Sequence, residues 1–187
     1  MPELPVSKSL NIAALSGLFY RTTNSYKYLY FLSILDILER RRFSFNAPIS
    51  LREIFAEMLV LAWYPHYYFK LSFGTQDKIA EKLEELDIET DIDLTSKNNF
   101  KSTLRNLILS QDLAKVFEFF KKNVPFRLIR PFLVDKLKKF DVNYEVVIRT
   151  PEIACSFFDI DKPLYCFNDI DFNDVDSIVL HEEWIDY

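Results

Sequence analysis

The chain has 187 residues, of which 49% are apolar and 16% aromatic, so it can bury the core of one domain, with or without a small appendage, and is too apolar to be disordered. It contains only two glycines, Gly17 and Gly74, which argues against glycine-rich phosphate loops, dinucleotide fingerprints and all-β folds with many tight turns. The net charge of −5 combines +3 over residues 1–78 and +2 over 79–139 with −10 over 140–187, so a mildly basic front is followed by an acidic tail.

The front of the chain predicts two helices, one over residues 10–20 and one over residues 22–42. Hydrogen-bond acceptors for the first turn of the second helix are offered by Thr22, Thr23 or Asn24. We expect this helix to be central to the core, because leucines recur along it at helical spacing: Leu29, Leu32, Leu35 and Leu38. Three successive arginines then suit its last turn, where the helix dipole favours cations.

The middle of the chain predicts further helices. Ser50 and Glu53 form a capping box, and the helix that they begin is expected to run to about Tyr64, where Pro65 stops it and Trp63 packs in the core. Thr75 is expected to cap the next helix, whose apolar stripe is Ile79, Leu83 and Leu86. Residues 87–95 indicate a linker, and helices are expected over 98–109 and 111–122.

After Pro131 the pattern changes. Residues 133–140 are still helical in character, whereas 144–150, 163–169 and 176–184 favour short strands. The sequence therefore predicts a mainly α fold: a helical, bundle-like domain over 1–140 and a small strand-containing acidic appendage over 141–187, which either stands apart or packs as part of the same domain.

No catalytic or metal site is expected in this chain. His66 and His181 stand alone, and residue 185, where a helical zinc motif beginning at His181 needs its second histidine, is Ile185. Cys155 and Cys166 have no second pair with zinc spacing and are interpreted as small buried hydrophobic residues in a reduced, cytoplasmic protein. We also expect no contact with a membrane, because no window approaches the ~18 uninterrupted apolar residues of a spanning helix.

Basic residues interleaved with aromatic ones make nucleic acid a candidate partner, since phosphate contacts and base stacking use this mixture. The alternative is that the arginine run is a solvated helix end, that the aromatic residues belong to the core, and that Lys27 and Lys70 fix helix packing. The candidate nucleic-acid-binding residues are Arg21, Lys27, Arg40, Arg41, Arg42, Lys70, Arg127 and Arg130.

Several stretches of the sequence resemble, in the same order, a bacterial family of HNH endonucleases. They are TTNSYKYLYFLSILDIL, AWYPHYYFKLSFGTQDKIAEKL, VPFRLIRPF and the later PLYCF and IVLHEEWIDY. In that family a C-terminal HNH domain follows, which holds a divalent metal and the histidine that activates water. No residue of this chain matches that nuclease motif, so the resemblance carries over no catalytic residue and implies no cofactor within the chain itself.

The resemblance implies the N-terminal recognition or regulatory module of a restriction or phage-defence endonuclease. A stand-alone interaction or regulatory subunit, bound to a partner protein of a defence system, is the second hypothesis. The two hypotheses differ in whether a catalytic HNH element belongs to the same protein.

Overall fold

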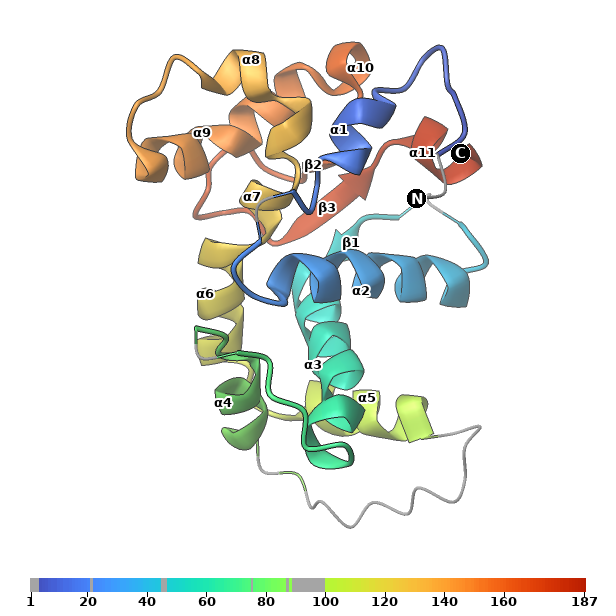
Figure 1. Cartoon of the computed structure of the whole chain (residues 1–187), viewed down its shortest axis with the longest axis vertical. Helices are drawn as coiled ribbons and strands as arrows, with labels where there is room; N and C mark the ends of the chain where they lie inside the picture. Colours follow the sequence, from blue (N-terminus) through green and yellow to red (C-terminus); the bar gives the residue numbers. More distant parts are fainter. Residues whose placement is uncertain (1–3, 21, 45–46, 75, 87, 89–99) are drawn as a thin grey trace.

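The computed structural model describes residues 4–20, 22–44, 47–74, 76–86, 88 and 100–187, and within them the fold is mainly α with a small sheet (Figure 1). The helices are α1 (Ile12–Ser16), α2 (Tyr26–Arg40), α3 (Leu51–Tyr67), α4 (Ile79–Glu84), α5 (Phe100–Ser110), α6 (Ala114–Asn123), α7 (Pro125–Leu128), the 3₁₀ turn η1 (Arg130–Phe132), α8 (Val134–Leu137), α9 (Asn143–Ser156), α10 (Phe158–Asp161) and α11 (Glu182–Asp186). The strands are β1 (Ile49–Ser50), β2 (Tyr165–Phe167) and β3 (Ser177–Leu180).

Helix α2 lies across the start of α3 at the centre of the molecule, and α5 crosses the far end of α3 (Figure 1). As predicted, α2 is central to the core, but Leu32 and Leu35 are 47% and 42% exposed. A repeat of three residues turns steadily away from one face of a 3.6-residue helix. The face that is buried instead follows steps of four, four and three residues, through Tyr26, Tyr30, Ile34 and Ile37.

The start of α2 is held by a distant carboxylate as well as by a local amide. Asn24 Oδ1 accepts from the Tyr26 N–H at 3.3 Å, as predicted for a capping residue. Asp77 Oδ2 accepts from the Ser25 N–H at 2.6 Å, and its other oxygen accepts from the Ile79 N–H at 2.9 Å. One side chain therefore fixes the first turns of both α2 and α4. The predicted cap Thr75 and nearly all of the predicted linker lie outside the described residues.

Helix α3 begins as the sequence predicts, with Ser50 Oγ accepting from the Glu53 N–H at 3.3 Å. The prediction that Pro65 ends the helix is wrong, because α3 continues through it to Tyr67. A proline this close to a helix end removes a single backbone hydrogen bond, which the remaining turns tolerate. Trp63 is 3% exposed and its ring centre lies 4.2 Å from that of Tyr67, so its predicted core position is confirmed.

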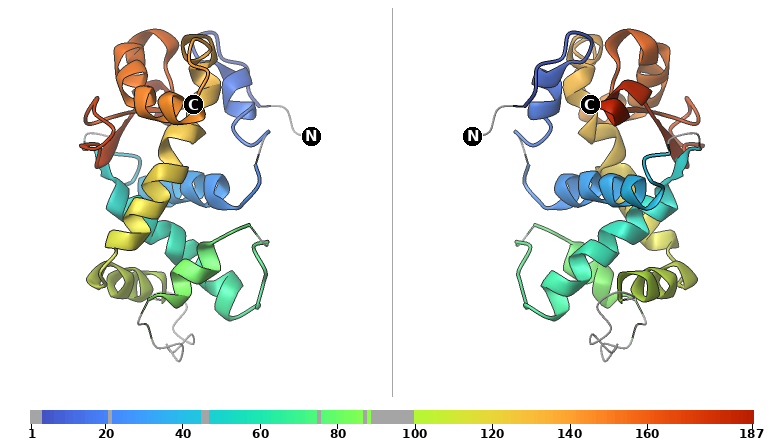
Figure 2. Two further views of the ribbon diagram at one scale, coloured as in Figure 1. Left: turned by 90° about the vertical axis from the view of Figure 1, so that its left-hand side faces the viewer. Right: turned by 90° about the vertical axis from the view of Figure 1, so that its right-hand side faces the viewer.

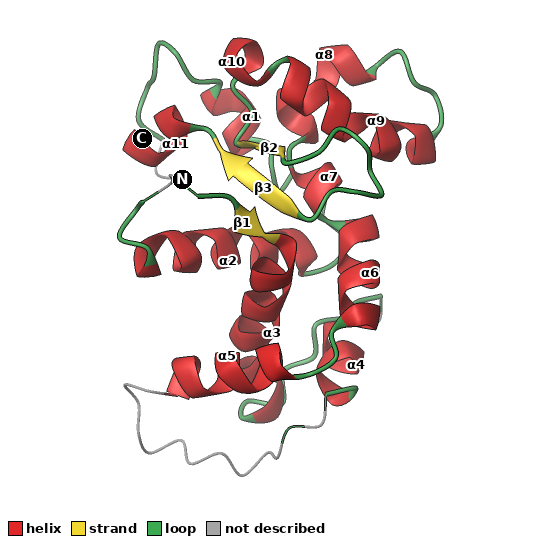
Figure 3. Cartoon of the chain, turned by 180° about the vertical axis from the view of Figure 1, so that it is seen from behind, coloured by secondary structure: helices red, strands yellow, loops and turns green. Residues whose placement is uncertain are grey.

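The sheet joins residues far apart in the sequence. Strand β3 lies in the middle, antiparallel to both neighbours, with Ile49 of β1 opposite Ile178 and Cys166 of β2 opposite Val179 (Figure 3). Beneath it, the buried Tyr165 hydroxyl donates to the Pro125 carbonyl at 2.6 Å. The segment after residue 141 therefore shares both a sheet and core contacts with the helices before it.

The predicted strand over 144–150 is wrong, because these residues form part of helix α9. Their β-branched side chains favour a strand locally. The helix nevertheless buries Val147, Thr150 and Ala154 on one face, and the Thr150 hydroxyl donates back to the Val146 carbonyl at 2.6 Å. Tertiary packing thus overrides the local preference. The strands expected within 163–169 and 176–184 are present as β2 and β3, but residues 182–184, at the end of the second segment, belong to helix α11.

Helix α6 packs against α3, and α7 follows α6 and packs against η1 and α9 (Figure 2). The two ends of the described chain meet, because the Tyr187 hydroxyl donates to the Pro5 carbonyl at 2.8 Å. None of the described helices is both long and apolar enough to cross a membrane.

Candidate anion-binding pocket

A cavity of about 500 Å³ opens where the connection between α1 and α2 passes beside α7 and η1 (Figure 1). Three cationic side chains line it, one each from α2, α7 and η1, and none of the described lining residues is acidic. We call this cavity the basic pocket; it is lined by Gly17, Tyr20, Thr22, Thr23, Asn24, Tyr26, Lys27, Asn123, Arg127, Arg130, Pro131 and Val134.

The local sequence explains why the cations converge. Lys27 is in the first turn of α2, and its Nζ donates to the Leu18 carbonyl at 3.2 Å, which holds it against the α1–α2 connection. Arg127 and Arg130 are three residues apart in tight helical structure, so their side chains lie on the same face. Phe126, Leu128 and Ile129, beside and between the arginines, are fully buried in the core instead.

The two arginines of the basic pocket have no counter-charge among the described residues. No ion pair in the described part of the chain involves Arg127 or Arg130, and the Arg130 Nη1 donates only to the neutral Asn143 amide oxygen, at 3.0 Å. Arg127 Nε, Arg130 Nε and Arg130 Nη2 are buried without a hydrogen-bond partner among the described residues. Buried polar groups normally find partners, so these N–H groups are available to a bound water or ion.

The pKa values of Lys27 and Arg130 are both lowered by their surroundings in the pocket. Burial lowers the pKa of Lys27, and the nearby Arg130 and Arg127 lower it further. Burial likewise lowers the pKa of Arg130, and Arg127 adds to the effect. The charges of Lys27 and Arg130 are therefore disfavoured by desolvation and by their like-charged neighbours, and an anion between them would relieve both costs.

Neutral groups around the cations add hydrogen-bonding capacity. Thr22, Thr23 and Asn24 line one wall, and Asn123 lines the other while its side-chain amide donates to the Phe119 carbonyl at 2.7 Å. The rim carries Tyr20, which is 86% exposed. Hydroxyl and amide donors around a cationic centre suit the oxygens of a phosphate or carboxylate.

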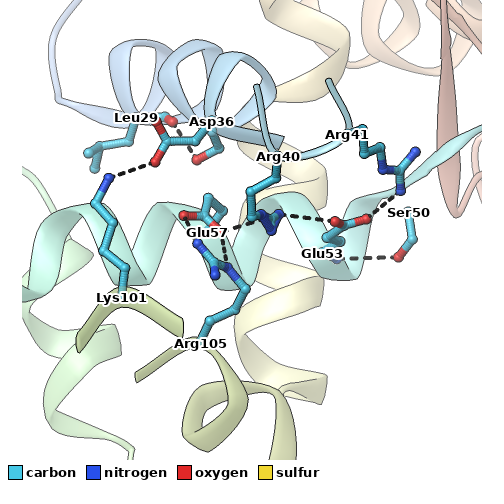
Figure 4. A network of polar contacts seen from close by, with 10 residues as sticks. Leu29, Asp36, Arg40, Arg41, Ser50, Glu53, Glu57, Lys101 and Arg105 are labelled. Carbon is cyan, nitrogen blue, oxygen red and sulfur yellow. Dashed lines mark hydrogen bonds and ion pairs between the residues drawn. The ribbon is translucent and has the colours of Figure 1, made fainter. Parts of the chain in front are cut away.

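The other candidate basic residues lie elsewhere. Arg40 and Arg41 are at the opposite end of α2 from Lys27, roughly 20 Å along the helix axis. Both pair with Glu53, at 3.1 and 2.7 Å, and Arg40 also lies 3.6 Å from Glu57 (Figure 4). Their charge is already compensated within the protein.

Of the remaining candidates, Arg42 is exposed just beyond α2, with a φ of 52°. Lys70 follows α3 and its Nζ lies 5.9 Å from the centre of the Tyr67 ring. Arg21 lies outside the described residues. Among the described candidates, the structure brings Lys27, Arg127 and Arg130 together in the basic pocket.

Both histidines have local structural partners. His66 Nε2 lies 3.5 Å from Glu84 Oε1, and His181 Nδ1 caps α11 by accepting from the Glu183 N–H at 3.3 Å. Among the described residues no three His, Cys, Asp or Glu side chains gather as metal ligands would.

The two cysteines interact, which sequence reasoning missed because it placed a strand where α9 lies. Cys155 on α9 is half-buried and donates to the Phe167 carbonyl at 3.2 Å, next to the buried Cys166. A hydrogen bond from the Cys166 thiol lowers the pKa of Cys155 and correspondingly raises that of Cys166. Cys155 therefore has more thiolate character than an ordinary cysteine.

Comparisons of the chain with protein-family models, with curated proteins and with solved structures found no match.

Proposed function

We propose that the chain is a recognition module that binds phosphate groups of nucleic acid in the basic pocket, as part of an HNH-type restriction or phage-defence endonuclease. The observation that carries the proposal is the convergence of Lys27, Arg127 and Arg130 in one cavity without a carboxylate among its described lining residues. Guanidinium groups bind phosphate oxygens through paired N–H donors, and Arg127 Nε, Arg130 Nε and Arg130 Nη2 have no partner among the described residues.

The sequence resemblance supports the same site. Two of the stretches that resemble the HNH family, TTNSYKYLYF and VPFRLIRPF, are about 100 residues apart in the sequence, and both supply lining residues of the basic pocket. Under this proposal the chain supplies recognition, and the metal and the activated water belong to an HNH element that this chain does not supply.

Salt dependence of duplex binding tests the proposal. Each phosphate contact releases condensed counterions, so affinity should fall steeply with salt. Replacing Lys27, Arg127 and Arg130 together with glutamine should weaken binding and flatten the slope of log affinity against log salt by up to about three units. Fluorescence anisotropy of a labelled duplex at several salt concentrations measures both quantities.

A matched variant removes the same charge outside the basic pocket. Arg42, Lys70 and Lys115 are exposed, and their joint replacement with glutamine should leave most of the affinity and slope intact. Equal losses in the two triple variants would show that binding is diffuse and not centred on the basic pocket. If the parent fails to bind even at low salt, the proposal is wrong and the stand-alone interaction subunit becomes the better hypothesis.

A further inference from the structure

Resting on the function proposed above, we propose that the basic pocket selects a terminal phosphate, the monoester at the end of a nucleic-acid strand, over the diesters within it. Three features of the pocket support this inference: its shape, its charge and its supply of unused donors.

The shape favours an end over a continuous strand. A cavity of about 500 Å³ with walls on two sides is the size of a small-ligand pocket, comparable to a nucleotide. An internal phosphate has a sugar on both sides, and duplex geometry holds it on a convex backbone. A terminal phosphate is tethered on one side only, so it can enter a cavity while the strand stays outside.

The charge favours a dianion. A phosphate monoester carries about −1.5 to −2 charges at pH 7, because its second pKa is about 6, whereas each diester carries only one. Three cations line the pocket, none of the described lining residues is acidic, and neither Arg127 nor Arg130 has a described ion pair. In a partly desolvated site the attraction grows with the charge of the ligand, so the monoester gains more than the diester.

The donor supply also favours three free oxygens. Arg127 and Arg130 each present a fork of N–H groups, and neither is engaged by a described carboxylate. Two forks and the surrounding hydroxyl groups can be satisfied by the three terminal oxygens of a monoester. A diester offers only two such oxygens. The exposed ring of Tyr20 at the rim is placed to stack on the terminal base.

The test uses one duplex sequence with four kinds of end: 5′-phosphate, 3′-phosphate, hydroxyl at both ends, and hairpin-closed without ends. We expect the intact chain to bind one of the phosphorylated duplexes roughly ten- to a hundredfold more tightly than the hydroxyl or closed forms, as expected for one or two charge-assisted hydrogen bonds. Inorganic phosphate should displace the phosphorylated duplex from the chain. Sulfate-free chloride at equal ionic strength should displace less of it.

A conservative substitution separates end recognition from general charge. Arg127→Lys keeps the positive charge but loses the planar fork, so it should lower the affinity for the phosphorylated end by a larger factor than it lowers the affinity for the hydroxyl-ended duplex. If the parent binds all four duplexes equally and the pocket triple variant weakens all four equally, the proposed function stands and this inference is overturned. If the parent binds none of them, both proposals fail.

Discussion

At the scale of single residues, Glu57 is a charged side chain buried in the core. It is fully buried within α3, and its carboxylate accepts from Arg105 Nε at 2.5 Å and from Nη2 at 2.9 Å (Figure 4). This hydrogen bonding is the first cause of the raised pKa of Arg105. A buried ion pair adds little over an apolar pair, but losing one partner leaves the other charge desolvated and unpaired.

We therefore predict that Glu57→Gln lowers the free energy of unfolding by about 3–5 kcal/mol, because Arg105 and Arg40 lose their buried counter-charge. Urea unfolding followed by circular dichroism measures the change. The control is Glu152→Gln, which breaks an exposed pair with Arg149 at 3.2 Å and should cost less than about 1 kcal/mol. Similar costs for the two variants would contradict the buried-pair interpretation.

The thiol pair gives a pH-dependent prediction. Because hydrogen bonding lowers the pKa of Cys155 and raises that of Cys166, Cys155 should become thiolate at a lower pH than its neighbour. The thiolate is the nucleophile, so alkylation of Cys155 should already be fast at pH 7 and slow only as the pH falls below its lowered pKa.

Iodoacetamide labelling of the native chain across pH 5–9, with peptides identified by mass spectrometry, measures both rates. In Cys166→Ser a hydroxyl replaces the thiol donor, so the pH dependence of the Cys155 alkylation rate should change. If Cys155 and Cys166 react at the same rate at pH 7, they do not share a proton in this way.

Sequence alone identified every described cation of the basic pocket but not the pocket itself. Lys27, Arg127 and Arg130 were candidates because they are basic residues inside aromatic motifs. Arg40 and Arg41 satisfied the same criterion, and only the structure shows that Glu53 neutralises them. Which cations lack a partner depends on contacts between distant elements, and residue pattern does not contain that information.

At the scale of elements, helix α3 organises the core, since α2, α5 and α6 all pack against it. Trp63 anchors its second half. Truncating a buried tryptophan removes a large apolar surface and leaves a cavity, so Trp63→Ala should cost about 3–5 kcal/mol. Tyr64, the next residue, is a large aromatic side chain that is 38% exposed.

Tyr64→Ala is therefore a matched control and should cost much less. Thermal unfolding of the two variants beside the parent makes the comparison. An unchanged melting temperature in Trp63→Ala would place the ring outside the core.

The elements differ in how far their sequences specify them. The cap at Ser50, the apolar stripe of α4 and the short strands β2 and β3 follow from local chemistry, and the structure agrees. The predictions for residues 144–150 and for Pro65 were wrong for one reason, which is that both rested on local effects. The β-propensity of residues 144–150 is worth about 1 kcal/mol, and the absence of an N–H at Pro65 removes a single hydrogen bond. Burying a helical face against several neighbours outweighs them.

At the scale of the whole molecule, the central position of β3 makes the front and the tail interdependent. Strand β3, residues 177–180, is the described partner of both β1 and β2. A chain that ends at residue 140 lacks this strand, and it also lacks the buried Tyr165 ring that packs against Tyr30 and donates to the Pro125 carbonyl. We therefore predict that a fragment of residues 1–140 does not fold cooperatively, whereas the full chain unfolds in one transition.

Differential scanning calorimetry tests this prediction through the agreement of calorimetric and van't Hoff enthalpies for the full chain. A sharp heat-absorption peak from the 1–140 fragment would show instead that the helical part is an independent folding unit.

The same strand order has a consequence for biosynthesis. During synthesis β1 cannot pair until Ile178 has been made, 129 positions after Ile49. At about 5–20 residues per second the ribosome needs roughly 6–26 s to make that stretch, during which the edge of β1 is open. A strand of only two residues offers little template for association with another nascent chain. Because β1 is short, the sheet can close late, when translation is nearly past residue 180, without a long unpaired strand edge being exposed to other chains before then.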